Sequence, residues 1–313
     1  MILSAFLTSS PLVATNAPES PEHCLCYNIS MLIDTHCHLH DREWFSPEQA
    51  ETCLKDAHAS GVEKIICIGT DPEDSQAAHD FATSHENVYW TYGIHPEFAN
   101  QYSGQPADLG NKQCSCLRTP GGSAEDERDD PATADVIDAT SDKNAVWSPK
   151  SATKPVAIGE IGLDYHYEGY NRTAQIRLFE QMLQLARDHN LPVSLHIREA
   201  FADAFPVLDN FPELKGVVHS YTGNKRELRQ ALDRGFYIGV NGYVTYATPP
   251  IPPLNCILLE TDAPFLTPVP FRGTINTPEY VKYVAACLSE KLGVAEETIV
   301  EQTTNHARKL FKI

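Results

Sequence analysis

The chain has 313 residues, of which 42% are hydrophobic, and a formal net charge of −18 at pH 7. This size can bury one large core or two small ones, so both a (β/α)8 barrel and an open doubly wound sheet are admissible. The acidic balance argues against broad, sequence-independent binding to nucleic acid, and no apolar run approaches the roughly 20 residues of a membrane span.

The first 30 residues are expected to form a flexible extension to a single domain over residues 31–313. Their apolar start carries no basic residue and is interrupted by the run 8–11, TSSP. A signal or transit peptide is therefore the less favoured alternative. The nine cysteines include no CxxC pair, which favours a reducing, cytoplasmic environment.

The segment from residue 31 to 95 alternates strands with helices. We predict strands over 31–35, 64–70 and 88–95, and helices over 46–61 and 71–85. Ser46 before Pro47 is typical of a helix start, because the serine caps the helix and proline suits its first turn. Strands separated by helices run parallel to one another.

This alternation stops in a segment that is rich in Ser, Gly, Pro and Asp, including GGSAEDERDDPATAD. Its lack of apolar periodicity predicts a disordered acidic insert over 103–153, after the third strand. A solvated spacer is the favoured interpretation, and a functional insertion is the alternative.

The second half of the chain resumes the alternation. Predicted strands begin at Val156 and cover 191–197, 215–219, 236–240 and 256–260, with helices over 171–190, 199–210, 224–234, 278–292 and 296–311. Eight strands with helical crossovers favour a TIM (β/α)8 barrel. Four prolines in 243–255 exclude a helix there, so one outer helix before strand eight is expected to be missing.

Six residues of metal-ligand type are placed at predicted strand ends. His36 and His38 are two residues apart on one strand, so both rings face the same side. Glu160 lies between two glycines, and a buried carboxylate is costly unless a cation or partner meets it. In a parallel barrel these residues converge with the remaining three at the C-terminal face; the three are His196, His219 and Asp262.

The motifs around these residues resemble the TatD family of metal-dependent deoxyribonucleases. They are the HxH pair, GIHP at 93–96, GEIGLD at 159–164, HxR at 196–198, HSYTG at 219–223 and ETDAP at 260–264. The resemblance covers residues 32–311 apart from the insert. It implies a TIM-barrel hydrolase with two divalent metal ions, Mg, Mn or Zn, that cleaves phosphodiester bonds at DNA ends.

The resemblance also implies a role for each matching residue. One metal would be held by His36, His38, Glu160 and Asp262, and the other by Glu160, His196 and His219, with Glu160 bridging the two. His95 would contact the substrate phosphate, and Arg198 and Tyr221 would line the site. For Asp164, orientation of a ligand and stabilisation of a turn are equally favoured.

The expected reaction is hydrolysis of a phosphodiester by a water that two metals activate, with Asp262 accepting its proton. DNA ends or single-stranded nucleic acid are the expected substrates. The residues leave two other hypotheses open. One is hydrolysis of another ester or an amide, such as D-aminoacyl-tRNA, and the other is a barrel that has lost enzymatic activity.

Overall fold

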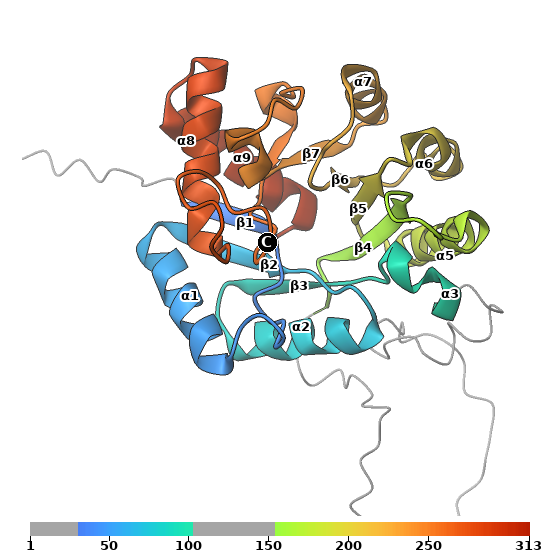
Figure 1. Cartoon of the computed structure of the whole chain (residues 1–313), viewed down its shortest axis with the longest axis horizontal. Helices are drawn as coiled ribbons and strands as arrows, with labels where there is room; N and C mark the ends of the chain where they lie inside the picture. The colour runs from blue at the N-terminus through green and yellow to red at the C-terminus, as the bar shows by residue number, and fades with distance from the viewer. Residues whose placement is uncertain (1–30, 103–153) are drawn as a thin grey trace, which may run out of the picture.

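Eight parallel strands form one sheet in the order β1 to β8, which confirms the predicted barrel (Figure 1). The computed structural model describes residues 31–102 and 154–313, so the predicted extension 1–30 and insert 103–153 lie outside the described residues. The strands are β1 (Leu32–Cys37), β2 (Val62–Cys67), β3 (Val88–Tyr92), β4 (Ala157–Asp164), β5 (Val193–Arg198), β6 (Gly216–Val218), β7 (Tyr237–Val240) and β8 (Ile257–Leu259).

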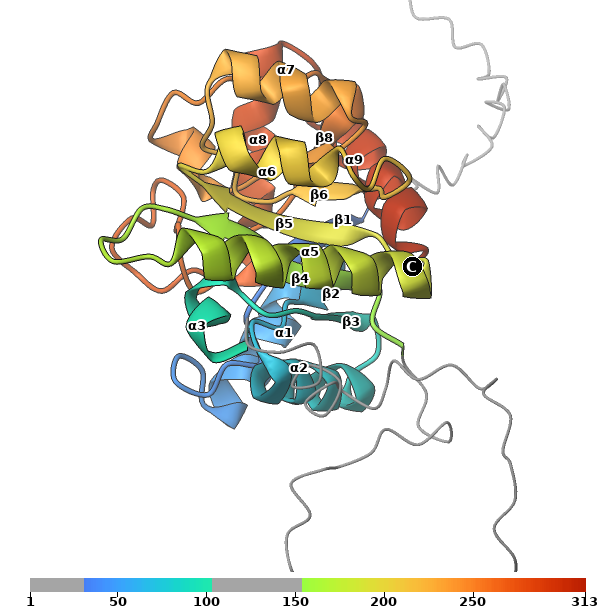
Figure 2. The same cartoon turned by 90° about the vertical axis from the view of Figure 1, so that its right-hand side faces the viewer.

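Helices surround the strands and cover the outside of the barrel (Figures 1 and 2). The α-helices are α1 (Pro47–Ala59), α2 (Pro72–Ser84), α3 (Ala99–Tyr102), α5 (Arg172–His189), α6 (Phe201–Leu208), α7 (Lys225–Asp233), α8 (Val281–Leu292) and α9 (Glu296–Phe311). Short 3-10 helices are η1 (Pro96–Phe98), η3 (Gly242–Thr245), η4 (Leu254–Cys256) and η5 (Pro278–Tyr280). Within the two described ranges, no helix is long and apolar enough to cross a bilayer.

Local signals explain where several helices begin. The Ser46 hydroxyl accepts a hydrogen bond from the backbone N–H of Gln49, and the Gln49 side-chain oxygen accepts one from the Ser46 backbone N–H. Asp71 caps α2 with its side chain alone, which accepts the backbone N–H of Asp74. These caps satisfy N–H groups that a helix start would otherwise leave unpaired.

The connection between β7 and β8 follows a different course from the other crossovers. Residues 241–256 are all described, and they contain η3 and η4 but no α-helix. Prolines 249, 250, 252 and 253 lie between the two 3-10 helices and cannot donate helical hydrogen bonds. On the outside of the barrel, α8 packs against η3 and β8.

Contacts between the first and last strands close the barrel. The Asp262 N–H donates to the carbonyl of His36 at 2.8 Å, and the His38 N–H donates to the carbonyl of Ala263 at 2.7 Å. These two bonds join segments more than 220 residues apart in the sequence. They hold the HxH pair beside Asp262.

The two ends of the barrel differ in polarity. At one end, Ile33, Ile66 and Leu258 pack in a single apolar cluster with Leu310 and Phe311 of α9. At the other end, where the strands terminate, the buried side chains include histidines and carboxylates. A ligand can therefore be bound in the polar mouth, while α9 packs against the apolar end.

The structure corrects three predicted strand boundaries. Glu160 lies inside β4 rather than at its end, because β4 stays paired with β5 as far as Asp164 and Arg198. His38 follows the last residue of β1, and His95 comes three residues after β3. These positions depend on pairing between strands, which local sequence does not reveal.

Glycine is required where β4 and β5 approach each other. Gly162 has a φ of +147°, and a Cβ atom there would lie 1.9 Å from the carbonyl oxygen of His196. A side chain at this position would strain the backbone and push β5 away. Gly169 also has a positive φ, +85°, but a Cβ atom there meets nothing within 4 Å.

We therefore predict different costs for alanine at these two positions. Gly162→Ala should lower the free energy of unfolding by at least about 3 kcal/mol, because strain and overpacking add, whereas Gly169→Ala should cost about 1 kcal/mol. Urea denaturation followed by circular dichroism measures both. Equal losses for the two variants would contradict the close approach of β4 and β5.

Candidate metal centre

The carboxylate of Glu160 is the hub of a buried cluster of imidazoles. Its Oε1 atom lies 2.7 Å from His196 Nδ1 and 2.9 Å from His219 Nε2. Its Oε2 atom lies 3.5 Å from His36 Nε2 and 4.0 Å from His38 Nε2. Each oxygen of one carboxylate thus faces its own pair of histidines.

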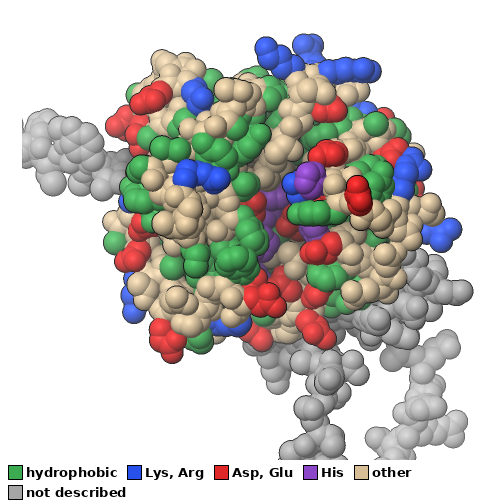
Figure 3. Space-filling model, viewed as in Figure 1, with side chains coloured by type: hydrophobic (Ala, Val, Ile, Leu, Met, Phe, Trp, Pro, Cys, Tyr) green, Lys and Arg blue, Asp and Glu red, His purple; other side chains and the backbone are tan. Residues whose placement is uncertain are grey.

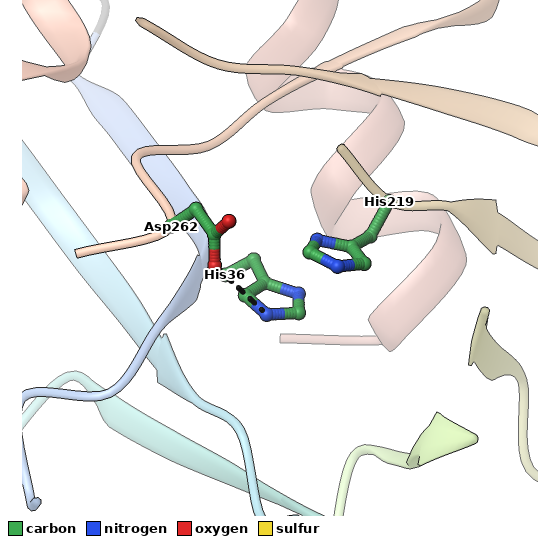
Figure 4. A group of neighbouring side chains, drawn as sticks. All are labelled: His36, His219 and Asp262. Atoms are coloured by element: carbon green, nitrogen blue, oxygen red, sulfur yellow. Dashed lines mark ion pairs between the residues drawn. The ribbon is translucent and has the colours of Figure 1, made fainter. Parts of the chain in front are cut away.

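Asp262 completes one side of this cluster. Its Oδ1 atom lies 3.6 Å from His36 Nε2 and 3.7 Å from His38 Nε2. Figure 4 shows the His36 and His219 rings side by side, with the Asp262 carboxylate next to His36. The two rings are stacked, with centroids 3.7 Å apart and an interplanar angle of 10°.

The structure thus brings together all six residues that the sequence predicts as metal ligands. Their donor atoms form groups in which every atom lies within 4.8 Å of the others, including His36–His38–Glu160 and Glu160–His196–His219. Such mixed imidazole and carboxylate sets suit Zn²⁺ or Mn²⁺. Both ring nitrogens of His36 are buried without a hydrogen-bond partner in the described chain, a cost that a cation at Nε2 would offset.

The far nitrogens of three imidazoles face acceptors outside the cluster. His38 Nδ1 lies 3.1 Å from the Ile68 carbonyl, His196 Nε2 lies 2.9 Å from Asp164 Oδ2, and His219 Nδ1 lies 3.5 Å from Glu260 Oε1. In His38 and His196 the hydrogen bond to the acceptor fixes the tautomer and leaves the other nitrogen to bind a metal, whereas His219 Nδ1 makes no hydrogen bond within the described chain. In each ring, that other nitrogen is the one that faces Glu160.

Asp164 makes both of the contacts that the sequence left open. Its Oδ2 accepts from His196, and its Oδ1 accepts the backbone N–H of His166 at 2.9 Å, which stabilises the turn after β4. The carboxylate therefore links the position of this loop to the orientation of His196.

Sequence reasoning missed Glu260. Its side chain is fully buried, and its Oε1 accepts the Ser220 N–H at 2.6 Å and the Asn241 side-chain amide at 3.3 Å. The signal was present, because Glu260 lies two residues before Asp262 in ETD. Its contact with His219 arises only when β6 and β8 are brought together.

The electrostatics of the cluster follow from burial and mutual attraction. Burial alone would raise the pKa of Glu160, but the nearby imidazoles, His219 foremost, bring this pKa well below its usual value. Burial opposes a charge on His219 too, and the Glu160 carboxylate outweighs burial and raises the pKa of His219 well above normal. Burial and the charge of His219 lower the pKa of His36. His36 therefore offers a neutral nitrogen.

The three predicted substrate-binding residues differ in how near they lie to the cluster. His95 Nε2 is 3.8 Å from Glu160 Oε1, and its ring packs edge-on against His196 at 4.5 Å. Arg198 follows His196 on β5, and its guanidinium lies 5.3 Å from the Tyr167 ring. Both have side chains at the mouth.

The contacts of the Tyr221 side chain are structural. It is buried, its hydroxyl donates to the Asn224 carbonyl at 2.7 Å, and its ring packs on Phe201. These contacts stabilise the loop between β6 and α7. Contact of Tyr221 with a substrate stays a prediction.

Comparisons with known proteins show the family to which the chain belongs. The sequence model of the family described as TatD related DNase matches residues 33–312. The metal-dependent hydrolase YabD of Bacillus subtilis is 31% identical over 293 residues, which cover 90% of this chain and all of YabD. The 3'-5' ssDNA/RNA exonuclease TatD of Pantoea ananatis is 30% identical over 83% of this chain and 92% of its own length.

A solved structure is similar over nearly the whole barrel. The TatD homologue YjjV of Escherichia coli superposes with a TM-score of 0.72 at 28% identity, covering 91% of this chain and 99% of YjjV.

The outer partner of His196 leads to a prediction. Asp164→Asn should weaken binding of one metal equivalent by about 10- to 100-fold, because the neutral amide no longer fixes the His196 tautomer. Glu199→Gln is the matched control, since Glu199 pairs with the exposed His166. Calorimetric titration with Mn²⁺ measures both, and unchanged affinity in the Asp164 variant would rule out the orienting role.

The charge state of the cluster leads to another prediction. Although burial opposes a charge on either ring, the Glu160 carboxylate raises the pKa of His219, and Asp164 and Glu160 raise that of His196. This favours the protonated imidazoles in the metal-free protein, and any such proton must leave before a metal binds. Metal affinity should therefore increase with pH, by about tenfold per pH unit for each proton displaced. Titration calorimetry in buffers of different ionisation enthalpy counts the protons. An affinity independent of pH between about 6 and 8 would contradict the protonated ground state.

Proposed function

The chain belongs to the TatD-related DNase family of metal-dependent hydrolases, and from this premise we propose that it is an exonuclease that cleaves phosphodiester bonds with two metal ions. The observation that carries the proposal is the position of Glu160, with Oε1 facing His196 and His219 and Oε2 facing His36 and His38. A carboxylate placed in this way is suited to bridging two cations.

The proposed ligands divide by these two oxygens. His36, His38, Glu160 and Asp262 would hold one ion, and Glu160, His196 and His219 the other. Divalent ions bound there would polarise a phosphoryl oxygen and make a water acidic enough to attack near neutral pH. The protein's own part is to position these ions and the substrate, and to move a proton.

We assign the proton transfer to Asp262. Its Oδ1 faces the HxH pair, while Oδ2 accepts no hydrogen bond from the described residues. The side chain is 13% exposed, so it reaches the mouth where a water and a phosphodiester would meet. A carboxylate in that position can take the proton from the attacking water as the bond to phosphorus forms.

His95 and Arg198 are the residues placed to receive the phosphate. His95 lies beside the cluster, and its Nδ1 is 3.2 Å from Glu97 Oε1, which orients Nε2 towards the mouth. Arg198 supplies positive charge from the neighbouring strand end, and an arginine can contact a phosphate in a bidentate manner. We propose that both contact non-bridging oxygens.

The acidic chain restricts the substrate. A net charge of −18 repels long duplex DNA, while two bound cations give a local positive site for a single phosphate group. Ends of single strands are therefore the proposed substrates. The name of the Pantoea relative, an exonuclease of single-stranded DNA and RNA, is consistent with this choice.

Loss of the proposed base tests the mechanism. Asp262→Asn should lower kcat on a single-stranded oligonucleotide by about 10²- to 10⁴-fold with Mn²⁺ or Mg²⁺ present. Asp41→Asn is the control, since Asp41 lies three residues beyond His38 and its carboxylate accepts only the Glu43 N–H among the described contacts. Release of nucleotides is followed by gel electrophoresis.

The same preparation separates the competing hypotheses. Deacylation of D-aminoacyl-tRNA without release of nucleotides would show that the protein is an esterase and not a nuclease. A folded, metal-loaded protein that performs neither reaction would defeat the enzymatic proposal.

A further inference from the structure

The exposed large hydrophobic side chains of the described chain are confined to one end of the barrel. Each has at least 36% of its surface exposed, and together they are Trp44, Tyr167, Tyr170, Tyr246, Phe265, Val269 and Ile275. All seven lie in segments that follow the carboxyl ends of β1, β4, β7 or β8. A concentration of exposed apolar side chains on one face is typical of a binding surface.

This surface adjoins the candidate metal centre. Figure 3 shows histidine side chains in a hollow at the middle of one face, with hydrophobic side chains on both sides. The nearest of the exposed rings is Phe265, whose centroid is 6.4 Å from that of His38. Trp44 packs edge-on against Phe265, at 5.4 Å and 77°. The two rings are exposed by 42% and 46%, so both keep a large surface for a ligand.

The backbone of Phe265 is held in place relative to Asp262. The Phe265 N–H donates to the Asp262 carbonyl at 2.7 Å, and the Phe265 carbonyl accepts the side-chain amide of Asn276 at 2.6 Å. Asn276 is fully buried and also bonds to the carbonyl of Thr261. The backbone of this loop is therefore fixed by hydrogen bonds, although the Phe265 ring that it carries is exposed.

Another exposed aromatic ring, that of Tyr167, lies across the mouth. Tyr167 follows β4, with the Arg198 guanidinium 5.3 Å from its ring centroid, whereas Trp44 and Phe265 follow β1 and β8. In a barrel ordered β1 to β8, β4 and β5 lie opposite the seam between β8 and β1. The metal residues thus lie between an aromatic pair on one side and an aromatic–cation pair on the other.

We propose that the Phe265 ring, supported edge-on by Trp44, is a stacking platform for the nucleobase at the end of a single strand, whose phosphate lies at the metal centre. This inference rests on the proposed function and assigns the residues that bind the base. Flat, exposed rings stack on any base, so the platform gives affinity for single strands without selecting sequence. A duplex end, whose bases are already stacked and paired, would use it poorly.

Binding of a product tests the platform independently of cleavage. Calorimetry with the Mg²⁺-loaded protein should give at least about tenfold tighter binding of deoxyadenosine 5′-monophosphate than of deoxyribose 5-phosphate, because stacking of a base on an aromatic ring typically adds this much. Phe265→Leu should abolish most of the difference, and Phe265→Tyr should retain it. Ile275→Ala is the matched control, an exposed apolar residue in the same loop.

The outcomes separate this inference from the proposed function. Two results would overturn the platform. One is equal binding of the two ligands by the unaltered protein, which would point to an apolar protein partner for this surface. The other is an undiminished preference for the base-containing ligand in Phe265→Leu with its metal content unchanged. A base-dependent affinity in a protein that leaves every oligonucleotide uncut would support the platform and refute the exonuclease.

Discussion

The structure depends on one buried carboxylate that is surrounded by imidazoles. Glu160 is 4% exposed, and its two oxygens face four histidines that lie in or directly after β1, β5 and β6. A negative charge in such a place is costly without compensation. In the metal-free protein, His196 and His219 lie against this carboxylate and, despite their burial, it raises the pKa of both, which favours compensation by protonated imidazoles, and in the proposed enzyme two cations would provide it. The same arrangement thus accounts for a stable site in the absence of metal and for the suitability of that site to bind metal ions.

The barrel is built so that this arrangement forms with little freedom. Hydrogen bonds between the first and last strand segments place Asp262 against the HxH pair. Asp164 and Glu260 then face the far nitrogens of His196 and His219. His196 is thereby oriented by a hydrogen bond to a residue of the neighbouring strand, and His219 lies against a carboxylate that follows β8. A displacement of β5 would move His196, which is why Gly162, where a Cβ atom would meet the His196 carbonyl, matters to the site.

The barrel and most residues of the cluster could be predicted from the sequence, because short motifs indicate them. The alternation of strands and helices indicated the barrel, and HxH, GEIGLD and ETDAP marked the residues that meet at its mouth. The position of Glu160 inside β4 could not be predicted, since the strand continues only because β5 pairs with it. Glu260 and Phe265 were overlooked for a similar reason. Their contacts with His219 and His38 join residues that only the closed barrel brings together.

The central claim is that Glu160 lies between two cations, and anomalous diffraction tests it most directly. Crystals soaked in Mn²⁺ and measured at the manganese absorption edge should give two peaks, one beside each oxygen of Glu160. The first peak should lie near His36, His38 and Asp262, and the second near His196 and His219. A single peak, or two peaks away from this carboxylate, would contradict the account.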